Sequence, residues 1–445
     1  MNGFAERRER LVRELAAADG GTPLRLGKRT SNLFRDRDAT PRRTLDVQGF
    51  GHVLAIDAEQ GWVDVEGMTP YDALADATLA HGLMPCVVPQ LKSITIGGAV
   101  AGVGIEASSF KYGLAHETVL ELEVLAGDGS IVVARPDNEH RDLFYGFPNS
   151  YGTLGYALRV KTKAVPVKPF VRLEHVHHRD PETFFDNVAA VCASSADFVD
   201  GVVFGPTEMV TTVGRFAETA PYTSDYTFDR IYYRSLRSRE EDFLTVRNFL
   251  WRWDTDWFWC SKNLYAQNPV VRRLLGRKRL NSRFYTRVMR WNSRVGVTKR
   301  LDRLVGRHPE SVIQDVDIPL DRAPEFLAFF QREIGILPVW ICPFRAYDPG
   351  ASWTLFPTRP NVLYVNFGFW DVVRARESHP AGHFNRLIER KVAELGGIKS
   401  LYSDSYFPRE EFAAIYNQPA YEALKRRYDP QGRFKGLYEK CVLRH

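Results

Sequence analysis

The stretch Thr95-Ile-Gly-Gly-Ala-Val-Ala-Gly-Val-Gly-Ile105 sets glycines among small apolar residues. Residues without a side chain leave backbone N–H groups open, and such groups can hold phosphate closely. We therefore expect a diphosphate to lie against Gly98 and Gly102. The run 102–107 formally matches the G-x-G-x-x-A pattern of dinucleotide-binding turns, but no strand, turn and helix frame it, so we do not interpret it as one. A tight turn or bulge is the other interpretation.

The flanking sequence alternates between strand and helix patterns. Residues 70–81 carry apolar side chains at helical spacing, with Thr69-Pro70 as cap and first position and Gly82 at the end. Residues 118–126 and 131–134 are expected to form a hairpin through Gly127-Asp-Gly129. Further short strands are predicted at residues 43–47, 52–57, 61–66 and 156–163.

A chain of 445 residues is long enough for two domains, or three at most. Pro166 and Pro169 mark the expected boundary, because composition and pattern change after them. We predict a charged amphipathic helix at 1–17, a first domain at 18–166 and a second at 167–445. The second domain should contain a strand near 362–368 and a helix from about 377 to 395.

Composition limits the class of protein and its compartment. The five cysteines stand far apart without a C-x-x-C pair, which argues against a disulfide framework or zinc site and favours a reducing cytosol. No metal partners stand at sensible spacing from His116, His175, His177 or His178. The first residues lack the apolar core of a signal peptide, and no apolar run reaches the roughly 20 residues needed to span a bilayer.

The glycine-rich stretch and its surroundings resemble the FAD-binding domain of the PCMH type, also called the vanillyl-alcohol-oxidase type. The matching pieces stand in the same order: Pro89, Tyr112-Gly113, 122–129, 142–144 and 152–156. The resemblance implies an α+β fold, with an FAD-binding domain of two subdomains followed by a mixed α/β substrate or cap domain. An earlier loop, Gly27-Lys-Arg-Thr-Ser-Asn32, resembles the family's first FAD loop, where Lys28 or Arg29 would neutralise phosphate.

Members that bind flavin covalently carry a histidine in that loop. This chain has none there, so we expect FAD without a covalent bond. The residues that the resemblance assigns to FAD are Lys28, Arg29, Thr30, Ser31, Asn32, Thr95, Ile96, Gly97, Gly98, Ala99, Gly102, Gly104, Ile105, Ser108, Ser109, Tyr112, Gly113, Gly152 and Gly155.

Within this family the chain most resembles the Δ24-sterol reductases, over nearly its whole length. The segments that carry the resemblance are 105–114, 337–344, 401–407 with 409–412, and 438–441. The chain departs from the animal and plant enzymes by lacking their hydrophobic N-terminal anchor. Its arginine-rich composition and the short opening 29–35 favour the bacterial relatives that reduce a methylene branch on a fatty acyl chain, as in tuberculostearic acid formation.

The resemblance therefore implies an FAD-dependent reductase of a carbon–carbon double bond in a lipid, with NADPH or NADH as electron donor. The expected substrate is a 10-methylene acyl chain, which becomes 10-methyl. A sterol-type side chain is the nearest alternative. An FAD oxidase of an alcohol or sugar acid, and a lipid-binding protein without turnover, also remain open.

Reduction of an isolated double bond needs a proton donor as well as a hydride donor. The candidates are Tyr402, Asp404 and Tyr406, which alternation would place on one side of a strand, and Glu106 and Lys111 beside the glycine-rich stretch. Each of them could instead be structural, because a tyrosine on a strand is more often a core or rim residue.

The segment 251–300 is basic and rich in tryptophan. No Asp or Glu occurs from Trp257 to Leu301. Apolar residues there could form one face of an interfacial helix on anionic lipid: Val270, Val271, Leu274, Leu275 and Leu280. A solvated basic face over a core built on Trp251, Trp253, Trp257 and Trp259 is the other interpretation. No motif indicates nucleic acid.

We therefore expect a cytoplasmic protein at the inner face of the cell membrane. A redox partner or a methyltransferase could work with it.

Overall fold

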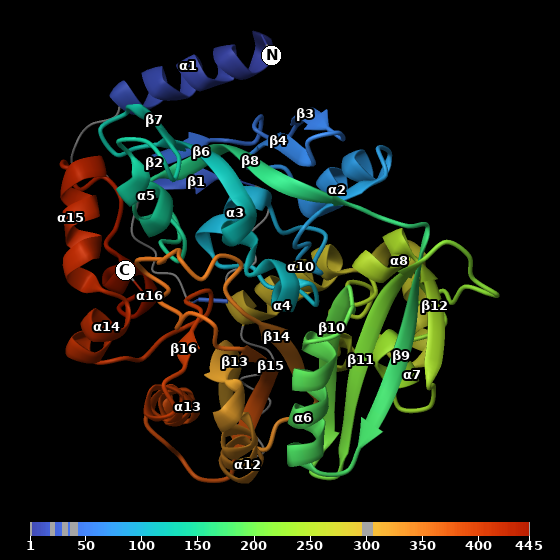
Figure 1. The fold of residues 1–445 in the computed structure, drawn as a ribbon. Coiled ribbons are helices and arrows are strands. Elements are labelled where there is room, and N and C mark those ends of the chain that lie inside the picture. Colours follow the sequence, from blue (N-terminus) through green and yellow to red (C-terminus); the bar gives the residue numbers. More distant parts are fainter. Residues whose placement is uncertain (1, 18–22, 29–33, 36–42, 296–305, 445) are drawn as a thin grey trace.

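The computed structural model describes residues 2–17, 23–28, 34–35, 43–295 and 306–444. The predicted FAD residues Arg29, Thr30, Ser31 and Asn32 lie outside them. The fold is α+β, as predicted: two antiparallel sheets carry helices on their faces (Figure 1).

The first sheet has six strands in the order β3-β4-β8-β6-β7, with β5 paired to β8. Its strands are β3 (Val53–Asp57), β4 (Trp62–Glu66), β5 (Leu83–Pro85), β6 (Val119–Leu125), β7 (Ile131–Ala134) and β8 (Tyr156–Pro166). The helices beside it are α2 (Tyr71–Leu79), α3 (Ile96–Ala101) and α5 (Arg141–Gly146), whereas α4 (Ser109–Tyr112) packs against β14 (Val339–Phe344) of the second sheet. The predicted hairpin is confirmed as β6 and β7.

Helix α2 confirms the helix predicted at residues 70–81, and it buries Tyr71, Leu74, Ala75 and Thr78. The predicted cap is wrong. Pro70 occupies the cap position without a side-chain hydrogen bond, and the Thr69 hydroxyl donates to the carbonyl of residue 52 instead.

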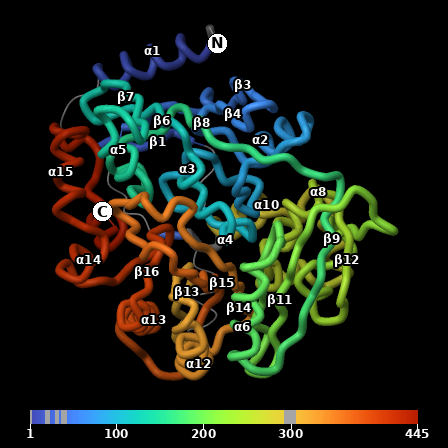
Figure 2. The backbone as a smooth tube through the Cα atoms, viewed as in Figure 1, coloured from blue at the N-terminus to red at the C-terminus, as the bar shows by residue number. Residues whose placement is uncertain are grey.

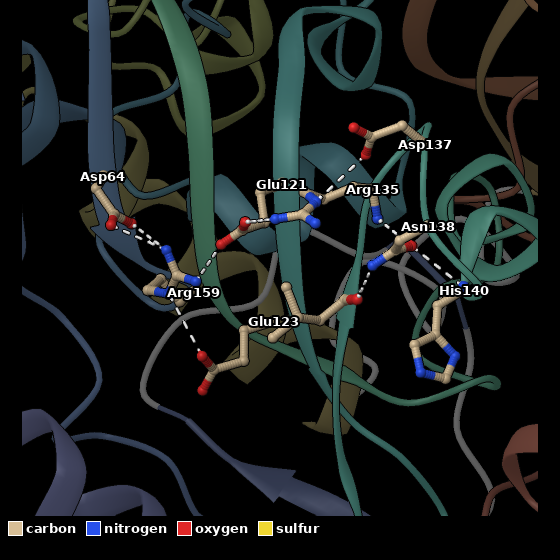
Figure 3. A network of polar contacts seen from close by, with 9 residues as sticks. Asp64, Glu121, Glu123, Arg135, Asp137, Asn138, His140 and Arg159 are labelled. Carbon is tan, nitrogen blue, oxygen red and sulfur yellow. Dashed lines mark hydrogen bonds and ion pairs between the residues drawn. The ribbon is translucent and has the colours of Figure 1, made fainter.

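The other face of the first sheet carries a network of ion pairs (Figure 3). Arg159 of β8 lies between its neighbouring strands and reaches Asp64 at 2.9 Å, Glu123 at 3.4 Å, and Glu121. Because one guanidinium bridges acids on both neighbouring strands, it favours a single pairing register. Burial raises the pKa of Asp64 even though Arg159 opposes that shift.

The N-terminal helix α1 (Asn2–Ala16) closes part of this face, and the helix predicted at 1–17 is confirmed. Its Leu11 and Leu15 are buried in a small core that also holds Leu158 of β8. The predicted strand at residues 43–47 is β2 (Arg43–Asp46), which pairs in parallel with β1 (Leu24–Gly27) and not with the larger sheet.

The second sheet has eight strands in the order β12-β9-β11-β10-β14-β15-β13-β16. They are β9 (Phe170–His178), β10 (Phe198–Gly205), β11 (Glu208–Ala217), β12 (Glu241–Thr245), β13 (His308–Pro319), β14 (Val339–Phe344), β15 (Tyr364–Ala375) and β16 (Ile398–Lys399). Helices α6 (Pro181–Cys192), α12 (Ala323–Glu333) and α13 (His383–Glu394) lie together along this sheet (Figure 1).

Two predicted boundaries in this half shift. The strand expected at 362–368 runs on to Ala375, because β15 pairs with β13 along the whole length of that strand. The helix expected from about residue 377 begins only at His383, because Pro380 and a left-handed Gly382 precede it.

Strand β13 shows why the second sheet has two different faces. Val312, Val316 and Ile318 are fully buried in the core that includes the three covering helices. Successive side chains of a strand point to opposite faces, so Asp315 and Asp317 lie on the other side. That other side faces the first sheet.

The chain passes from β8 to β9 between Pro166 and Phe170, where we predicted a domain boundary. The C-terminal helices return to the first half: α14 (Arg409–Ile415), α15 (Gln418–Tyr428) and α16 (Leu437–Cys441). Helix α15 lies beside α5, as Figures 1 and 2 show, and Tyr428 donates a hydrogen bond to Asp142 at 2.7 Å. The division at residue 166 stays a prediction.

Four of the five tryptophans of the segment 251–300 do not face outward, and the fifth, Trp291, is exposed. Trp251, Trp253, Trp257 and Trp259 are all buried in the main core, so the prediction of a tryptophan-rich membrane face is wrong for these side chains. Trp253 stacks on Phe258 and meets Trp259 edge to face, and Trp259 in turn lies against Trp370. Trp257 stacks on Phe34.

The predicted amphipathic helix is shorter than expected. Helix α9 (Pro269–Leu275) exposes Val270 and Leu274, whereas Leu280 lies beyond its end and is buried. Arg272, one of the basic residues of this segment, is buried and pairs with Asp256 at 2.7 Å. Within the described ranges, no helix is long and apolar enough to cross a membrane.

Candidate active site

A cavity of about 460 Å³ lies between the two sheets, within the size range of ligand and cofactor sites. One side is formed by the glycine-rich stretch and the turn that leads into β8. The other side comes from the second sheet and from the buried aromatic cluster. It includes Trp257, Phe258, Asp315, Asp317, Trp340, Asn366 and Trp370.

The glycines of this wall have no room for a side chain. A Cβ on Gly97 would lie 2.8 Å from the carbonyl oxygen of Gly67, and a Cβ on Gly102 would lie 2.8 Å from that of Gly98. Gly155 has φ +142°, a conformation that residues with a side chain rarely adopt. These close contacts with the neighbouring chain require glycine at positions that line the cavity.

The expectation that these N–H groups are uncovered is wrong in part. The amide of Gly97 donates to Gly67 at 2.8 Å, and that of Gly104 donates to Ala99 at 2.8 Å. Gly98 donates to the Thr95 hydroxyl over a longer 3.3 Å, as part of the cap of α3. These glycines shape the wall mainly through the absence of side chains.

Residues in strained backbone conformations gather at the cavity. Val103, Tyr151, Trp257 and Phe258 line it, and each has a positive φ, between 44° and 58°. Such conformations cost of the order of 1–3 kcal/mol each and persist where the surrounding structure enforces them, often at functional sites. Their placement favours this cavity as the functional site.

Basic side chains line one region of the cavity. They include Lys28, Arg35, Lys435, Lys440 and Arg444. Lys440 donates to the carbonyl oxygen of Tyr151 at 2.6 Å, and the Arg35 guanidinium lies 4.9 Å from the centre of the Tyr151 ring. Such a set suits a ligand that carries phosphate.

Two carboxyl groups face the cavity from β13. Asp317 accepts a hydrogen bond from the Asn366 amide at 2.7 Å, and burial raises its pKa to about 7. Burial also raises the pKa of Asp315 well above its usual value, and the neighbouring Asp317 adds to the shift. Both groups can therefore keep a proton at a pH where ordinary carboxyl groups have lost theirs.

Tyr402 lies beside Asp315. Its hydroxyl accepts a hydrogen bond from the Trp370 indole at 2.8 Å, and a polar contact with the phenol partly offsets the rise in the pKa of Asp315. Gly368 stands opposite Asp315 on β15, where a Cβ would lie 2.8 Å from the Asp315 carboxyl. The glycine makes the room that Asp315 occupies.

Comparisons with known proteins agree with this geometry. Residues 5–135 match the model of a family described as FAD binding domain. The chain is 27% identical to the human Delta(24)-sterol reductase over 417 residues, which are 87% of this chain and 75% of the relative. It is 25% identical to that of Pisum sativum over 455 residues, 89% and 76% of the two chains. Cytokinin dehydrogenase 6 of Oryza sativa subsp. japonica is 29% identical over 197 residues, 43% of this chain and 35% of the relative.

The chain is an FAD-dependent oxidoreductase. It contains an FAD-binding domain of the PCMH type and is similar to the Delta(24)-sterol reductases.

The cavity of this oxidoreductase fits FAD. The glycine wall that no Cβ could share, the basic residues and the aromatic lining match a ligand that joins a diphosphate to flat rings. Ten of the residues that we assigned to FAD line the cavity. They are Lys28, Thr95, Gly97, Gly98, Ala99, Gly102, Gly104, Ile105, Gly152 and Gly155.

The remaining assigned residues in the described part of the chain do not line it. Ile96 is in the core, the Ser108 hydroxyl donates to the carbonyl of Cys86 at 2.7 Å, and the Ser109 hydroxyl accepts from the amide of Glu106 at 3.1 Å. Tyr112 and Gly113 end α4 away from the cavity. These residues hold the local structure.

Of the five proton-donor candidates, only Tyr402 lines the cavity. Glu106 is buried elsewhere, and its carboxylate pairs with Arg252 at 3.1 Å. Lys111 pairs with Asp197 at 3.1 Å, on a partly exposed site. These two are placed as structural residues.

Asp404 and Tyr406 also lie off the cavity wall. Asp404 pairs with Arg444 at 3.6 Å, and the Arg444 guanidinium lies 4.8 Å from the centre of the Tyr406 ring. The strand expected here is wrong: regular pairing ends with β16, and residues 401–408 continue without a helix or strand.

Sequence reasoning missed Asp315 and Asp317. The signal was present in Gln314-Asp-Val-Asp-Ile-Pro319, where acids alternate with apolar residues inside a strand. Carboxyl groups are almost never buried without a partner or a function. The basic residues near the C-terminus carried no comparable signal, since only the fold returns them to the first sheet.

Proposed function

We propose that this oxidoreductase reduces a carbon–carbon double bond in a lipid, and that its substrate is a methylene branch on a fatty acyl chain. The branch would become a methyl group at the expense of NADPH or NADH. When bound, reduced FAD supplies the hydride that adds to one carbon of such a bond. The proposal builds on the similarity to the sterol reductases and on one feature of the site, the proton-holding carboxyl groups in the cavity.

The chemistry of an isolated double bond explains why those carboxyl groups matter. Such a bond is poorly electrophilic, so protonation of one carbon has to lead or accompany hydride addition to the other. Two acids that keep their protons near neutral pH, in the same cavity as the FAD residues, supply what that reaction requires.

The other lining residues suit an apolar substrate. Trp257, Phe258, Trp340 and Trp370 present aromatic surface, and the Phe258 and Trp370 ring centres lie 4.4 Å apart. Apolar and aromatic lining with few polar groups is typical of sites for apolar ligands. An acyl chain and a sterol side chain would both find such a surface, and the similarity to the sterol reductases favours the sterol as the second candidate.

We also propose that the enzyme lies on an anionic membrane at the inner face of the cell membrane. Exposed apolar residues stand within the basic segment: Tyr265, Val270, Leu274 and Trp291, exposed by 77%, 67%, 77% and 59%. Exposed basic residues accompany them: Arg273, Arg277, Lys278, Arg279, Arg283 and Arg287. Each basic group near such a surface contributes about 1 kcal/mol of binding, which salt would weaken.

Helix α10 (Ser282–Val295) connects this segment with the cavity. Arg290 lines the cavity, and its neighbour Trp291 is exposed. The cavity would therefore lie close to a lipid in the membrane. An enzyme that adds the methylene carbon, and a redox partner, are the proteins we would expect to work with it.

Two other functions would use the same site. An FAD oxidase of an alcohol or sugar acid is favoured by the partial similarity to a cytokinin dehydrogenase. A lipid-binding protein without turnover would keep the cavity and lose the chemistry. Anaerobic bleaching of the flavin by NADPH would favour the reductase, whereas reoxidation by oxygen after an alcohol donor would favour the oxidase.

The decisive experiment is lipid mass spectrometry of a strain that lacks this protein. We expect a lipid two hydrogens short of its normal product to accumulate, and restored expression to remove it. An acyl methylene species identifies the first substrate, and a sterol with an unreduced side chain identifies the second. An unchanged lipid profile contradicts both.

A further inference from the structure

Asp315 has unusual surroundings for a carboxyl group inside a protein. It stands on β13 with its side chain on the cavity face of the second sheet. Its Oδ1 atom is inaccessible to water and has no hydrogen-bond partner in the described part of the structure. Asp315 as a whole is partly buried, but a carboxylate with one oxygen in that state would be costly, which favours the protonated carboxyl group.

Two buried acids, Asp317 in the cavity and Glu106 outside it, differ from Asp315 in their partners. The Asn366 amide donates to Asp317, and the Arg252 guanidinium pairs with Glu106. Each of these contacts lowers the pKa of its carboxyl group, although burial still raises both pKa values to about 7. Two side chains influence the pKa of Asp315, namely Asp317 and Tyr402, and neither of them is a cation.

The fold keeps Asp315 in this place by short-range packing. Gly368, directly opposite on β15, leaves the space for its carboxyl. Strand β16 pairs with β13 at Val316, and this pairing brings Tyr402 alongside. Trp370 then fixes the Tyr402 hydroxyl through its indole N–H.

We propose that Asp315 is the general acid of this enzyme and that Tyr402 positions it. This assignment rests on the proposed function, the reduction of a lipid double bond. One carbon of the double bond takes the proton of the Asp315 carboxyl as the pi bond breaks, and the other carbon takes a hydride with both electrons, which come from NADPH or NADH. Asp315 is left as a carboxylate and regains a proton from water.

The test separates two half-reactions in the FAD-loaded Asp315→Asn protein. Anaerobic bleaching of the flavin by NADPH should keep the wild-type rate, because it needs no proton from Asp315. Reoxidation of the bleached flavin by vesicles of a phosphatidylglycerol with a methylene-branched acyl chain should slow by about 10²- to 10⁴-fold, the usual contribution of a general acid. Asp321→Asn makes the same chemical change on an exposed side chain outside the cavity and should reoxidise normally.

Tyr402→Phe tests the positioning role. It should slow reoxidation less than Asp315→Asn does, and it should alter the pH profile of that step, which a purely structural effect would leave in place. Infrared spectroscopy gives a readout that does not depend on turnover. Wild-type protein at neutral pH should show the band of protonated carboxyl groups, and Asp315→Asn should lose the part of that band that belongs to Asp315 and keep the contribution of Asp317. The band also reports on a variant that folds but binds little FAD.

The outcomes distinguish the two proposals. In one outcome, neither the methylene lipid nor a sterol with a side-chain double bond reoxidises the bleached flavin of the wild type. The proposed function is then wrong, and so is the role of Asp315. If the wild type reoxidises but Asp315→Asn does so equally fast, the assignment of the acid alone is wrong. A large loss in Asp317→Asn with Asp315→Asn unaffected would move the role to Asp317.

Discussion

Replacing Asp317 by Asn should make the protein more stable at neutral pH, and the gain should depend on pH. The unfolded chain loses the Asp317 proton near pH 4, whereas burial raises the folded pKa from 3.8 to about 7. Between those values the folded state must hold a proton that the unfolded state has released. The contribution of this group to stability is therefore complete below about pH 4, falls as the pH rises to about 7, and stays low above it.

The magnitude follows from the size of the shift. A rise of about 3 pKa units corresponds to about 4 kcal/mol at 1.36 kcal/mol per unit. Asparagine cannot ionise, and its side-chain oxygen can still accept the 2.7 Å hydrogen bond from Asn366. We compare the free energy of unfolding of the variant with that of the wild type. Between pH 4 and pH 8, this difference should change by up to about 4 kcal/mol in favour of the variant.

Urea unfolding of both proteins at a series of pH values measures this difference. The free energies of unfolding of variant and wild type should diverge between pH 4 and pH 7 and run parallel above that range. Asp371→Asn removes an acid on β15 that pairs with Lys262 at 2.7 Å, so this control should lower the stability at neutral pH where Asp317→Asn raises it. Parallel curves for Asp317→Asn over the whole range would refute the reasoning.

Three further outcomes follow from the packing. Gly368→Ala should slow substrate-dependent reoxidation and lower the free energy of unfolding by about 1–3 kcal/mol, because its Cβ would lie 2.8 Å from the carboxyl group of Asp315. Gly205→Ala, with open space around its Cβ, should change neither quantity. Equal behaviour of the two variants would contradict the steric argument. Leu274→Ser should weaken binding to phosphatidylglycerol vesicles in a sedimentation assay by about tenfold or more, since burying a leucine contributes about 1.5–3 kcal/mol; unchanged sedimentation would rule out this surface. Arg252→Met should lower the free energy of unfolding, measured in urea, by about 3–5 kcal/mol, because it leaves the buried Glu106 and Asp200 unpaired. A loss below 1 kcal/mol would show that other groups compensate for the missing guanidinium.

The sequence by itself determined the features that short stretches of chain encode. The glycine-rich stretch, helix α2 and the β6–β7 hairpin were all predicted from contiguous residues. Backbone freedom, helical periodicity and turn chemistry act over a few residues, so they can be read without knowing the fold. The likeness to an FAD-binding domain rests on the same kind of local pattern, and the family comparison agrees with it.

Only the tertiary structure decided which side chains share the cavity. Asp315 and Tyr402 are far apart in sequence and meet because β16 pairs with β13. Lys440 reaches Tyr151 because the C-terminal helices return to the first sheet. Four tryptophans of the basic segment, from Trp251 to Trp259, are buried in the main core, which their spacing could not reveal. Side-chain burial and long-range pairing depend on the balance of packing over the whole molecule, and that balance leaves no mark in a short stretch of sequence.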